Sequence, residues 1–274
     1  MQFLGSLLFT IFLFAWTGLY AIFFALLGGF VPFERRAWFP RNWGSVLLWA
    51  LKWTCRLDYV VEGRENLPPG NHVALVKHAS SWETFAQAVL LPPQAWVLKR
   101  ELTWLPFVGW CARLLRAIAV DRGAGHVAVK SVLTQGRARL AEGLWVVIFP
   151  EGTRMPPGVT RKYGISGALM AIENARLIVP VAHDAGYYWP RRGLLKKRGT
   201  IRVVIGKPVI AAGRDPRELN QEIQAWVEAH SGPPGGAAAP AGAAAAPGSA
   251  AAPAGAAANR TVGGAGGRGR PGDG

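Results

Sequence analysis

The segment Val73-Ala-Leu-Val-Lys-His-Ala-Ser-Ser-Trp-Glu-Thr84 carries the main indication of the fold class. Its first four residues are apolar and predict a short buried strand. A polar turn follows, and Ser80-Ser-Trp-Glu83 has the pattern of a capping box at the start of a helix. A buried strand that leads directly into a helix is typical of α/β proteins, in which functional groups gather at strand ends.

The same alternation continues along the chain. Further buried strands are predicted at residues 96–98, 117–120, 144–149, 177–181 and 201–205, and helices at residues 81–91, 125–142, 166–174 and 214–230. The pattern indicates one α/β domain over residues 58–230, with a mixed or parallel sheet flanked by helices. It does not determine the order of the strands.

The N-terminal segment, residues 1–33, has no charged side chain and is rich in Leu, Phe, Ile and Trp. About 20 apolar residues cross a bilayer core, so the segment predicts a transmembrane anchor. A cleaved signal peptide would need a basic start and a small-residue cleavage site, which Gln2 and Gly28-Gly29-Phe30 supply poorly. Arg35, Arg36 and Arg41 follow the segment, and this positive-inside bias places the body in the cytoplasm.

Residues 34–57 combine basic side chains with Trp38, Trp43, Trp49 and Trp53. One interpretation is a segment at the headgroup level of a membrane, where amphipathic rings and long basic side chains are both favourable. The alternative is an ordinary core helix near the edge of the domain. The basic group Arg191, Arg192, Lys196, Lys197 and Arg198 is also predicted to serve the membrane surface.

The net charge of +15 lies mostly in the body, because the tail after Gly232 has only three Arg and one Asp. Such a body suggests an anionic partner: nucleic acid, an acidic membrane surface or a phosphorylated substrate. The apolar N-terminal segment favours a membrane over nucleic acid. Residues 231–274 are almost entirely Gly, Ala and Pro and are predicted to be disordered. Cys55 and Cys111 are interpreted as free thiols, and no Cys/His cluster has zinc spacing.

Two groups of residues are candidates for chemistry. His78 at a strand end, with Glu83 in the first helical turn, fits a general base and the carboxylate that orients it. Glu83 also fits the alternative of a simple helix cap. Phe149-Pro-Glu-Gly-Thr-Arg154 follows the most apolar strand, where backbone amides and a guanidinium suit a phosphate, or where the chain simply turns.

Four blocks in order resemble the glycerolipid acyltransferase family, in particular its bacterial members that acylate 1-acylglycerol-3-phosphate. The blocks are His78-Ala-Ser-Ser-Trp-Glu83, Lys99-Arg-Glu-Leu-Thr-Trp-Leu-Pro-Phe-Val-Gly109, Phe149-Pro-Glu-Gly-Thr-Arg154 and Ile178-Val-Pro-Val-Ala182. The resemblance covers residues 58–210 and is specific as a set. It departs from the family at Glu83, where Asp is usual, and this leaves the acceptor less certain.

The resemblance implies acyl transfer from acyl-CoA or acyl carrier protein to the sn-2 hydroxyl of 1-acylglycerol-3-phosphate, giving phosphatidic acid. His78 would be the base and Glu83 its orienting acid. The remaining implied site residues bind the substrate phosphate: Glu151, Gly152, Thr153 and Arg154, with Lys99 and Arg100. Backbone amides around Glu151 and Gly152 are candidate donors to the reaction oxyanion.

The resemblance further implies no metal and no cofactor beyond the acyl donor. The expected partners are lysophosphatidic acid, the donor and anionic membrane lipids, without nucleic acid. The expected location is the inner membrane, with one crossing and the catalytic domain in the cytoplasm. Two alternatives stay open: an acyltransferase for another lyso-lipid acceptor, and a catalytically silent lipid-binding protein.

Overall fold

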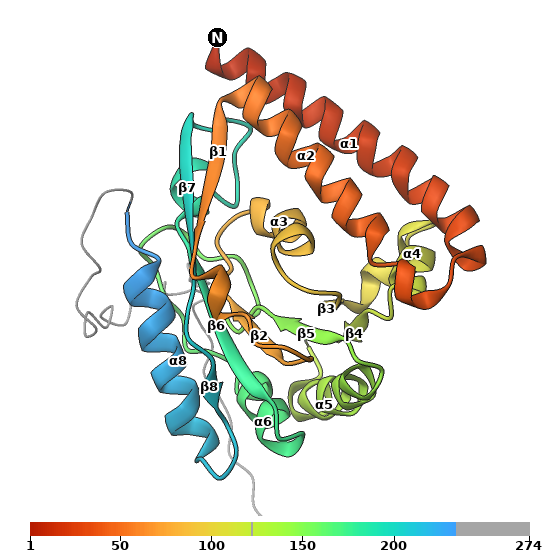
Figure 1. Cartoon of the computed structure of the whole chain (residues 1–274). Helices are drawn as coiled ribbons and strands as arrows, with labels where there is room; N and C mark the ends of the chain where they lie inside the picture. The colour runs from red at the N-terminus through yellow and green to blue at the C-terminus, as the bar shows by residue number, and fades with distance from the viewer. Residues whose placement is uncertain (122, 234–274) are drawn as a thin grey trace, which may run out of the picture. The chain divides into compact units, whose positions relative to one another are not determined.

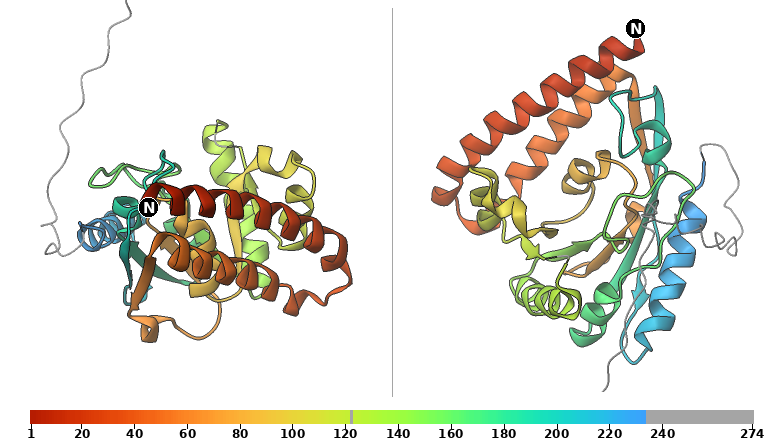
Figure 2. Two further views of the ribbon diagram at one scale, coloured as in Figure 1. Left: turned by 90° about the horizontal axis from the view of Figure 1, so that it is seen from above. Right: turned by 180° about the vertical axis from the view of Figure 1, so that it is seen from behind.

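A computed structural model describes residues 1–121 and 123–233 (Figure 1). The predicted disordered tail, residues 231–274, falls almost wholly outside the described residues. The described part is a layered α/β arrangement in which one sheet separates two groups of helices (Figures 1 and 2). The predicted fold class is therefore confirmed.

Eight strands form the sheet within the described residues. They are β1 (Leu57–Glu62), β2 (Val73–Val76), β3 (Gln94–Lys99), β4 (Ile118–Val120), β5 (Trp145–Ile148), β6 (Leu177–His183), β7 (Gly199–Ile205) and β8 (Val209–Ile210). The spatial order is β1-β7-β6-β2-β5-β3-β4, and β8 pairs with β6. β6, β2, β5, β3 and β4 run parallel, whereas β7 is antiparallel to β6. The carboxyl ends of the five parallel strands therefore meet at one edge of the sheet.

The main helices are α1 (Gln2–Leu27), α2 (Trp38–Cys55), α3 (Trp82–Leu90), α4 (Val108–Leu114), α5 (Gly125–Ala141), α6 (Ser166–Glu173), α7 (Ala185–Tyr188) and α8 (Pro216–His230). Short 3₁₀ turns lie at η1 (Gly28–Phe30), η2 (Phe33–Arg35), η3 (Arg64–Asn66) and η4 (Arg100–Trp104). α1, α2 and α3 cover one face of the sheet, and α5, α6 and α8 cover the other (Figures 1 and 2).

β2 shows why the central strands are apolar along their whole length. Val73 and Leu75 belong to the core on the side of α5, α6 and α8, while Ala74 and Val76 belong to the core beneath α2 and α3. Successive side chains point to opposite faces, and here both faces are covered by helices. The next residue, Lys77, continues this alternation, and its side chain points to the face of the sheet that α8 covers.

The first two helices are part of this packed body. Phe9 of α1 and Leu47 and Leu51 of α2 are buried in the same core cluster as the sheet residues. The core therefore extends to the N-terminal side of residue 58. Trp49 and Trp53 are exposed on the opposite face of α2. α2 is thus a core helix on one face, and the membrane-surface interpretation of its exposed face stays a prediction.

Lys196 is buried, so the prediction that it contributes to a basic membrane surface is wrong. Its side chain is only 1% exposed, because the loop that carries it packs against α1. The Nζ donates to the Ser6 carbonyl at 3.3 Å and to the Thr10 hydroxyl, and it lies 4.8 Å from the centre of the Trp189 ring. The ammonium is thus used to hold the first turns of α1 on the body.

Several elements were not predicted from the sequence: β1, β8, α4 and α7. β1 was missed because it is an edge strand that carries acids at Asp58 and Glu62. β8 has only two residues, which is too short to show an alternating pattern. α8 begins two residues later than predicted. The side chain of Asp215 accepts from the amides of Arg217 and Glu218, and Pro216 occupies the first helical position.

Candidate active site

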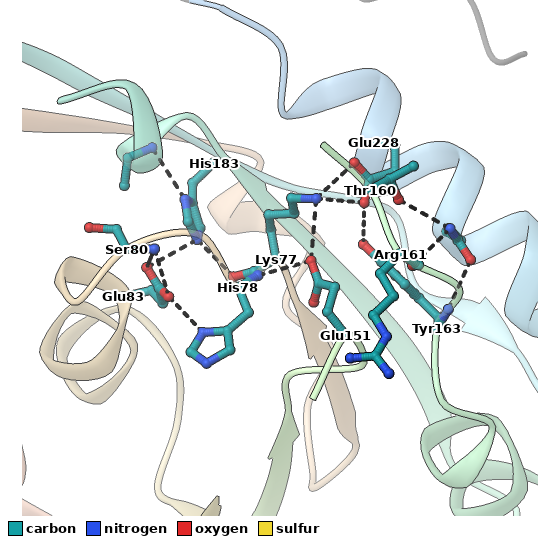
Figure 3. Close-up of polar contacts among 12 residues, drawn as sticks. Lys77, His78, Ser80, Glu83, Glu151, Thr160, Arg161, Tyr163, His183 and Glu228 are labelled. Carbon is teal, nitrogen blue, oxygen red and sulfur yellow. Dashed lines mark hydrogen bonds and ion pairs between the residues drawn. The ribbon is translucent and has the colours of Figure 1, made fainter. Parts of the chain in front are cut away.

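His78 lies in the turn directly after β2, and the structure brings it into contact with Glu83. Its Nδ1 is 2.7 Å from Glu83 Oε1, and the residue is 8% exposed. The imidazole stacks on the ring of Phe149 with 4.2 Å between centroids. The ring is therefore fixed in orientation by the Glu83 carboxylate on one nitrogen (Figure 3) and by the aromatic face of Phe149.

Glu83 combines the two roles that the sequence left open. Its oxygens accept from the Ser80 amide at 3.0 and 2.9 Å, while the Ser80 hydroxyl accepts from the Trp82 amide at 3.1 Å. This is a capping box, and it holds the carboxylate in position to contact His78. The helix cap and the histidine partner are the same side chain.

His183 is a further member of the site, and the sequence patterns do not single it out. Its Nε2 donates to the Lys77 carbonyl at 2.9 Å and lies 3.7 Å from Glu83 Oε2. Its Nδ1 accepts from the Ala185 amide at 3.3 Å, which fixes the tautomer. Burial lowers the pKa of His183, so this ring is neutral, and burial raises the pKa of Glu83.

The signal for His183 lay in the strand order. β6 is parallel to β2, with Val76 opposite Val181. His183 follows two residues later and therefore lies level with the turn that carries His78. The sequence predicts the two strands but not their adjacency, so this neighbour was not predictable from spacing.

The Phe149–Arg154 segment holds the same turn from the other side. Glu151 Oε1 accepts from the His78 amide at 3.2 Å, and the Met155 amide donates to the His78 carbonyl at 2.7 Å. Arg154 donates from Nε to the Ser80 carbonyl at 2.9 Å and from Nη2 to Thr84 Oγ1 at 3.2 Å. Because β2 and β5 are neighbouring parallel strands, the two candidate groups form one site.

Glu151 is the buried acid of this segment. It is 3% exposed, and burial raises its pKa to about 7, whereas the nearby Lys77 ammonium lowers it. Gly152 occupies a left-handed conformation, with φ of 68°, that suits glycine. Its amide donates to the Phe149 carbonyl at 3.0 Å and so closes the turn, while the expected contact of amides around Glu151 and Gly152 with the oxyanion stays a prediction. Thr153 lies half-buried in the same turn.

Lys99 and Arg100 lie at the same edge of the sheet, at the end of β3, but the structure does not bring them into contact with this turn. Lys99 pairs with Glu101 at 3.0 Å, and Arg100 pairs with Asp121 at 2.8 Å. Both side chains are about half exposed. Their predicted contact with a substrate phosphate stays a prediction.

The arrangement is suited to one kind of chemistry. A buried carboxylate orients the histidine, which can then remove a proton from a hydroxyl through Nε2. The guanidinium of Arg154 lies beside the same turn and can attract an anionic substrate. These groups form a site, in an α/β protein, that is suited to general-base catalysis beside a bound anion.

Comparison with known proteins gives the family. A family model described as "Acyltransferase" matches residues 58–184. A 1-acyl-sn-glycerol-3-phosphate acyltransferase of Pseudomonas aeruginosa is 43% identical over 201 residues, which cover 72% of this chain and 78% of the relative. A protein of the same name from Saccharomyces cerevisiae is 30% identical over 161 residues, covering 56% of this chain and 52% of the relative. The chain belongs to the acyltransferase family, and it is an enzyme that transfers acyl groups to oxygen.

A solved structure supports the fold. The crystal structure of the 1-acyl-sn-glycerophosphate acyltransferase PlsC from Thermotoga maritima aligns with a TM-score of 0.69 at 23% identity, covering 83% of this chain and 95% of that one. At this identity the match concerns the fold alone. It agrees with the mixed sheet and the flanking helices described above.

Proposed function

We propose that this enzyme transfers a fatty acyl group from acyl-CoA or acyl carrier protein to the sn-2 hydroxyl of 1-acylglycerol-3-phosphate, forming phosphatidic acid. The observation that carries the proposal is the 2.7 Å contact between His78 and Glu83, set inside the turn held by Glu151 and Arg154. The name of the Pseudomonas relative supports the choice of acceptor. The enzyme then works in phospholipid biosynthesis.

In this reaction His78 Nε2 takes the proton of the acceptor hydroxyl while its oxygen attacks the thioester carbonyl. Glu83, bonded to Nδ1, stabilises the imidazolium that forms. The tetrahedral intermediate collapses, the carbon–sulfur bond breaks, and the leaving thiolate takes the proton from His78. Because the donor is already an activated thioester, the chemistry requires neither a metal nor a further cofactor.

Arg154 is assigned to the phosphate of the acceptor. A guanidinium has five N–H donors, and the bonds to Ser80 and Thr84 use one from Nε and one from Nη2. The other donors are suited to a phosphate oxygen. The same side chain donates to the Ser80 carbonyl, so phosphate binding at Arg154 would also affect the position of the turn that carries His78.

The proposal places the enzyme at the bacterial inner membrane with its body in the cytoplasm. α1 is long and apolar enough to cross a bilayer, and most of its apolar side chains are uncovered. Its first turns are nevertheless bonded to the body: Gln2 Nε2 donates to the Cys55 carbonyl at 3.1 Å, and Ser6 Oγ accepts from the Lys196 amide at 2.9 Å. These contacts favour a helix embedded along one leaflet over the single crossing that the sequence predicts.

The test is an assay of the detergent-purified enzyme with lysophosphatidic acid and each acyl donor in turn. Wild type is expected to form phosphatidic acid, and His78→Ala is expected to lower kcat by at least about 10²-fold, since general-base catalysis contributes that much. His126→Ala, at an exposed histidine, is the matched control and should behave as wild type.

The outcomes separate the alternatives. Activity that survives in His78→Ala removes this residue from the mechanism. Product only with another lyso-lipid moves the acceptor assignment to that lipid. If wild type binds lipid but forms no product with any combination of donor and acceptor, the result supports the catalytically silent alternative.

A further inference from the structure

A second buried charge lies next to His78 and has no part in the mechanism above. Lys77 is 4% exposed. Its Nζ is bonded to both carboxylate oxygens of Glu228 at 2.7 and 2.8 Å and lies 3.3 Å from Glu151 Oε1. A buried ammonium needs such partners, because an uncompensated charge in the interior is costly. Here the partners come from two distant parts of the chain (Figure 3).

Glu228 is the last of three polar residues on one side of α8. Asn220, Gln224 and Glu228 follow each other at intervals of four, each directly after a buried apolar residue. This spacing puts them in one row along the helix. The row faces the segment that follows the Phe149–Arg154 turn.

That segment is held at three atoms of one residue. Asn220 Nδ2 donates to the Tyr163 carbonyl at 3.1 Å, and the Tyr163 amide donates to Gln224 Oε1 at 3.1 Å. The Tyr163 hydroxyl donates to Glu228 Oε1 at 3.0 Å. Tyr163 is itself buried. α8 thus fixes both Lys77 and the chain leading away from Glu151.

We propose that Lys77 is a positioning residue, held by Glu228 of α8, that fixes Glu151 and through it the turn carrying His78. The link is continuous: Glu228 bonds Lys77, Lys77 contacts Glu151, and Glu151 accepts from the His78 amide at 3.2 Å. The inference rests on the proposed function and deepens it. It gives a catalytic purpose to α8, which lies beyond residues 58–184 matched by the family model.

Charge is part of this device. Glu151 titrates among Lys77 from the end of β2, Glu228 from α8, and Tyr163 and Arg161 from the loop between β5 and α6 (Figure 3). The ammonium of Lys77 opposes the rise in the pKa of Glu151 that burial causes. Losing Lys77 therefore raises this pKa further. Losing the charge of Glu228 lowers the pKa of Glu151, because Glu151 is then the carboxylate that the Lys77 ammonium stabilises.

The experiment compares Glu228→Gln with Glu222→Gln, the same change at an exposed position of the same helix. In Glu228→Gln we expect kcat to fall about tenfold with little change in the KM for lysophosphatidic acid, because a misplaced base impairs the chemical step more than binding. Glu222→Gln should match wild type. Because the pKa of Glu151 should fall in Glu228→Gln and rise in Lys77→Met, the acidic limb of the pH profile of kcat should move to lower pH in the first variant and to higher pH in the second.

If Lys77 and Glu228 had only a structural role, the acidic limb would not move in opposite directions in the two variants. Equal kcat and equal pH profiles in Glu228→Gln and wild type overturn the proposal, and so do shifts of the same sign in Glu228→Gln and Lys77→Met. If Lys77→Met fails to fold, Tyr163→Phe replaces it. This change removes one bond to Glu228 without changing a charge, so kcat should fall with an unmoved limb; a wild-type kcat overturns the proposal.

Hydrogen exchange separates this inference from the proposed function. In Glu228→Gln the peptide containing the His78 amide should exchange faster than in wild type and in Glu222→Gln, because its acceptor Glu151 is less firmly held. Unchanged exchange overturns the positioning role. A wild-type protein that makes no phosphatidic acid overturns the proposed function, while the exchange result still tests the network.

Discussion

At the scale of single residues, Glu83 shows how one side chain can serve folding and chemistry. Its carboxylate caps the first turn of α3 through the Ser80 amide and meets His78 Nδ1 at 2.7 Å. The extra methylene relative to the aspartate usual in this family does not prevent that contact. The cap fixes the carboxylate, and the fixed carboxylate orients the imidazole.

Substitution at this position separates the charge from the shape. Glu83→Gln keeps the volume but places an amide against the Ser80 N–H or His78, so we expect kcat to fall about 10²-fold. Glu83→Asp keeps the charge and should retain more activity than Glu83→Gln. Steady-state kinetics with lysophosphatidic acid measure both, with circular dichroism as the control for folding. Wild-type kcat in Glu83→Gln would show that Glu83 is only a helix cap.

The sequence allows the contacts of some of these residues to be predicted, but not those of others. The contact between His78 and Glu83 was predictable because both lie in one strand–turn–helix unit and a separation of five fits a base and its orienting acid. Lys77, His183 and Glu228 were not, because their contacts depend on which strands are neighbours and where α8 packs. Such long-range contacts leave no local spacing in the sequence.

At the scale of elements, α2 owes its place to close packing against α3. Gly44 lies where the helices approach, and a methyl group there would come 2.6 Å from the Phe85 carbonyl and 3.0 Å from Val89 Cγ2. Both distances are shorter than a normal van der Waals contact. Since α3 carries Glu83 in its first turn, this packing also supports the site.

Gly44→Ala should therefore destabilise the protein by about 1–3 kcal/mol, the usual cost of overpacking, although alanine is the better helix former. The control is Gly18→Ala in α1, where an added methyl group meets nothing within 4 Å. Thermal unfolding in detergent, followed by circular dichroism, measures both. A Gly44→Ala protein as stable as Gly18→Ala would contradict the close approach of α2 and α3.

The central elements were predictable and the peripheral ones were not, for physical reasons. β2, β5 and β6 are apolar on both faces because helices cover both sides of the sheet, and this composition is visible in the sequence. β1 lies at an edge of the sheet and needs no such composition, and β8 has only two residues. The short helices α4 and α7 have too few turns to show a helical period.

At the scale of the whole molecule, the exposed apolar side chains of the first two helices form a surface suited to lipid. α1 exposes many large apolar side chains, among them Phe3, Phe14 and Leu19, and α2 exposes Trp49 and Trp53. Under the proposed function, the acceptor has one acyl chain and the product has two, so both would reside in the bilayer. Holding the site at the membrane raises the effective concentration of the acceptor.

The bonds between α1 and the body decide how this membrane contact is made. If Gln2 and Ser6 keep their contacts with Cys55 and Lys196, the N-terminus must stay on the same side of the membrane as the body. An epitope tag before Met1 should then be accessible in inside-out vesicles and protected in spheroplasts, as the body is. A tag accessible only from the outer side would establish a single crossing and would mean that the contacts of Lys196 with α1 are absent in the membrane.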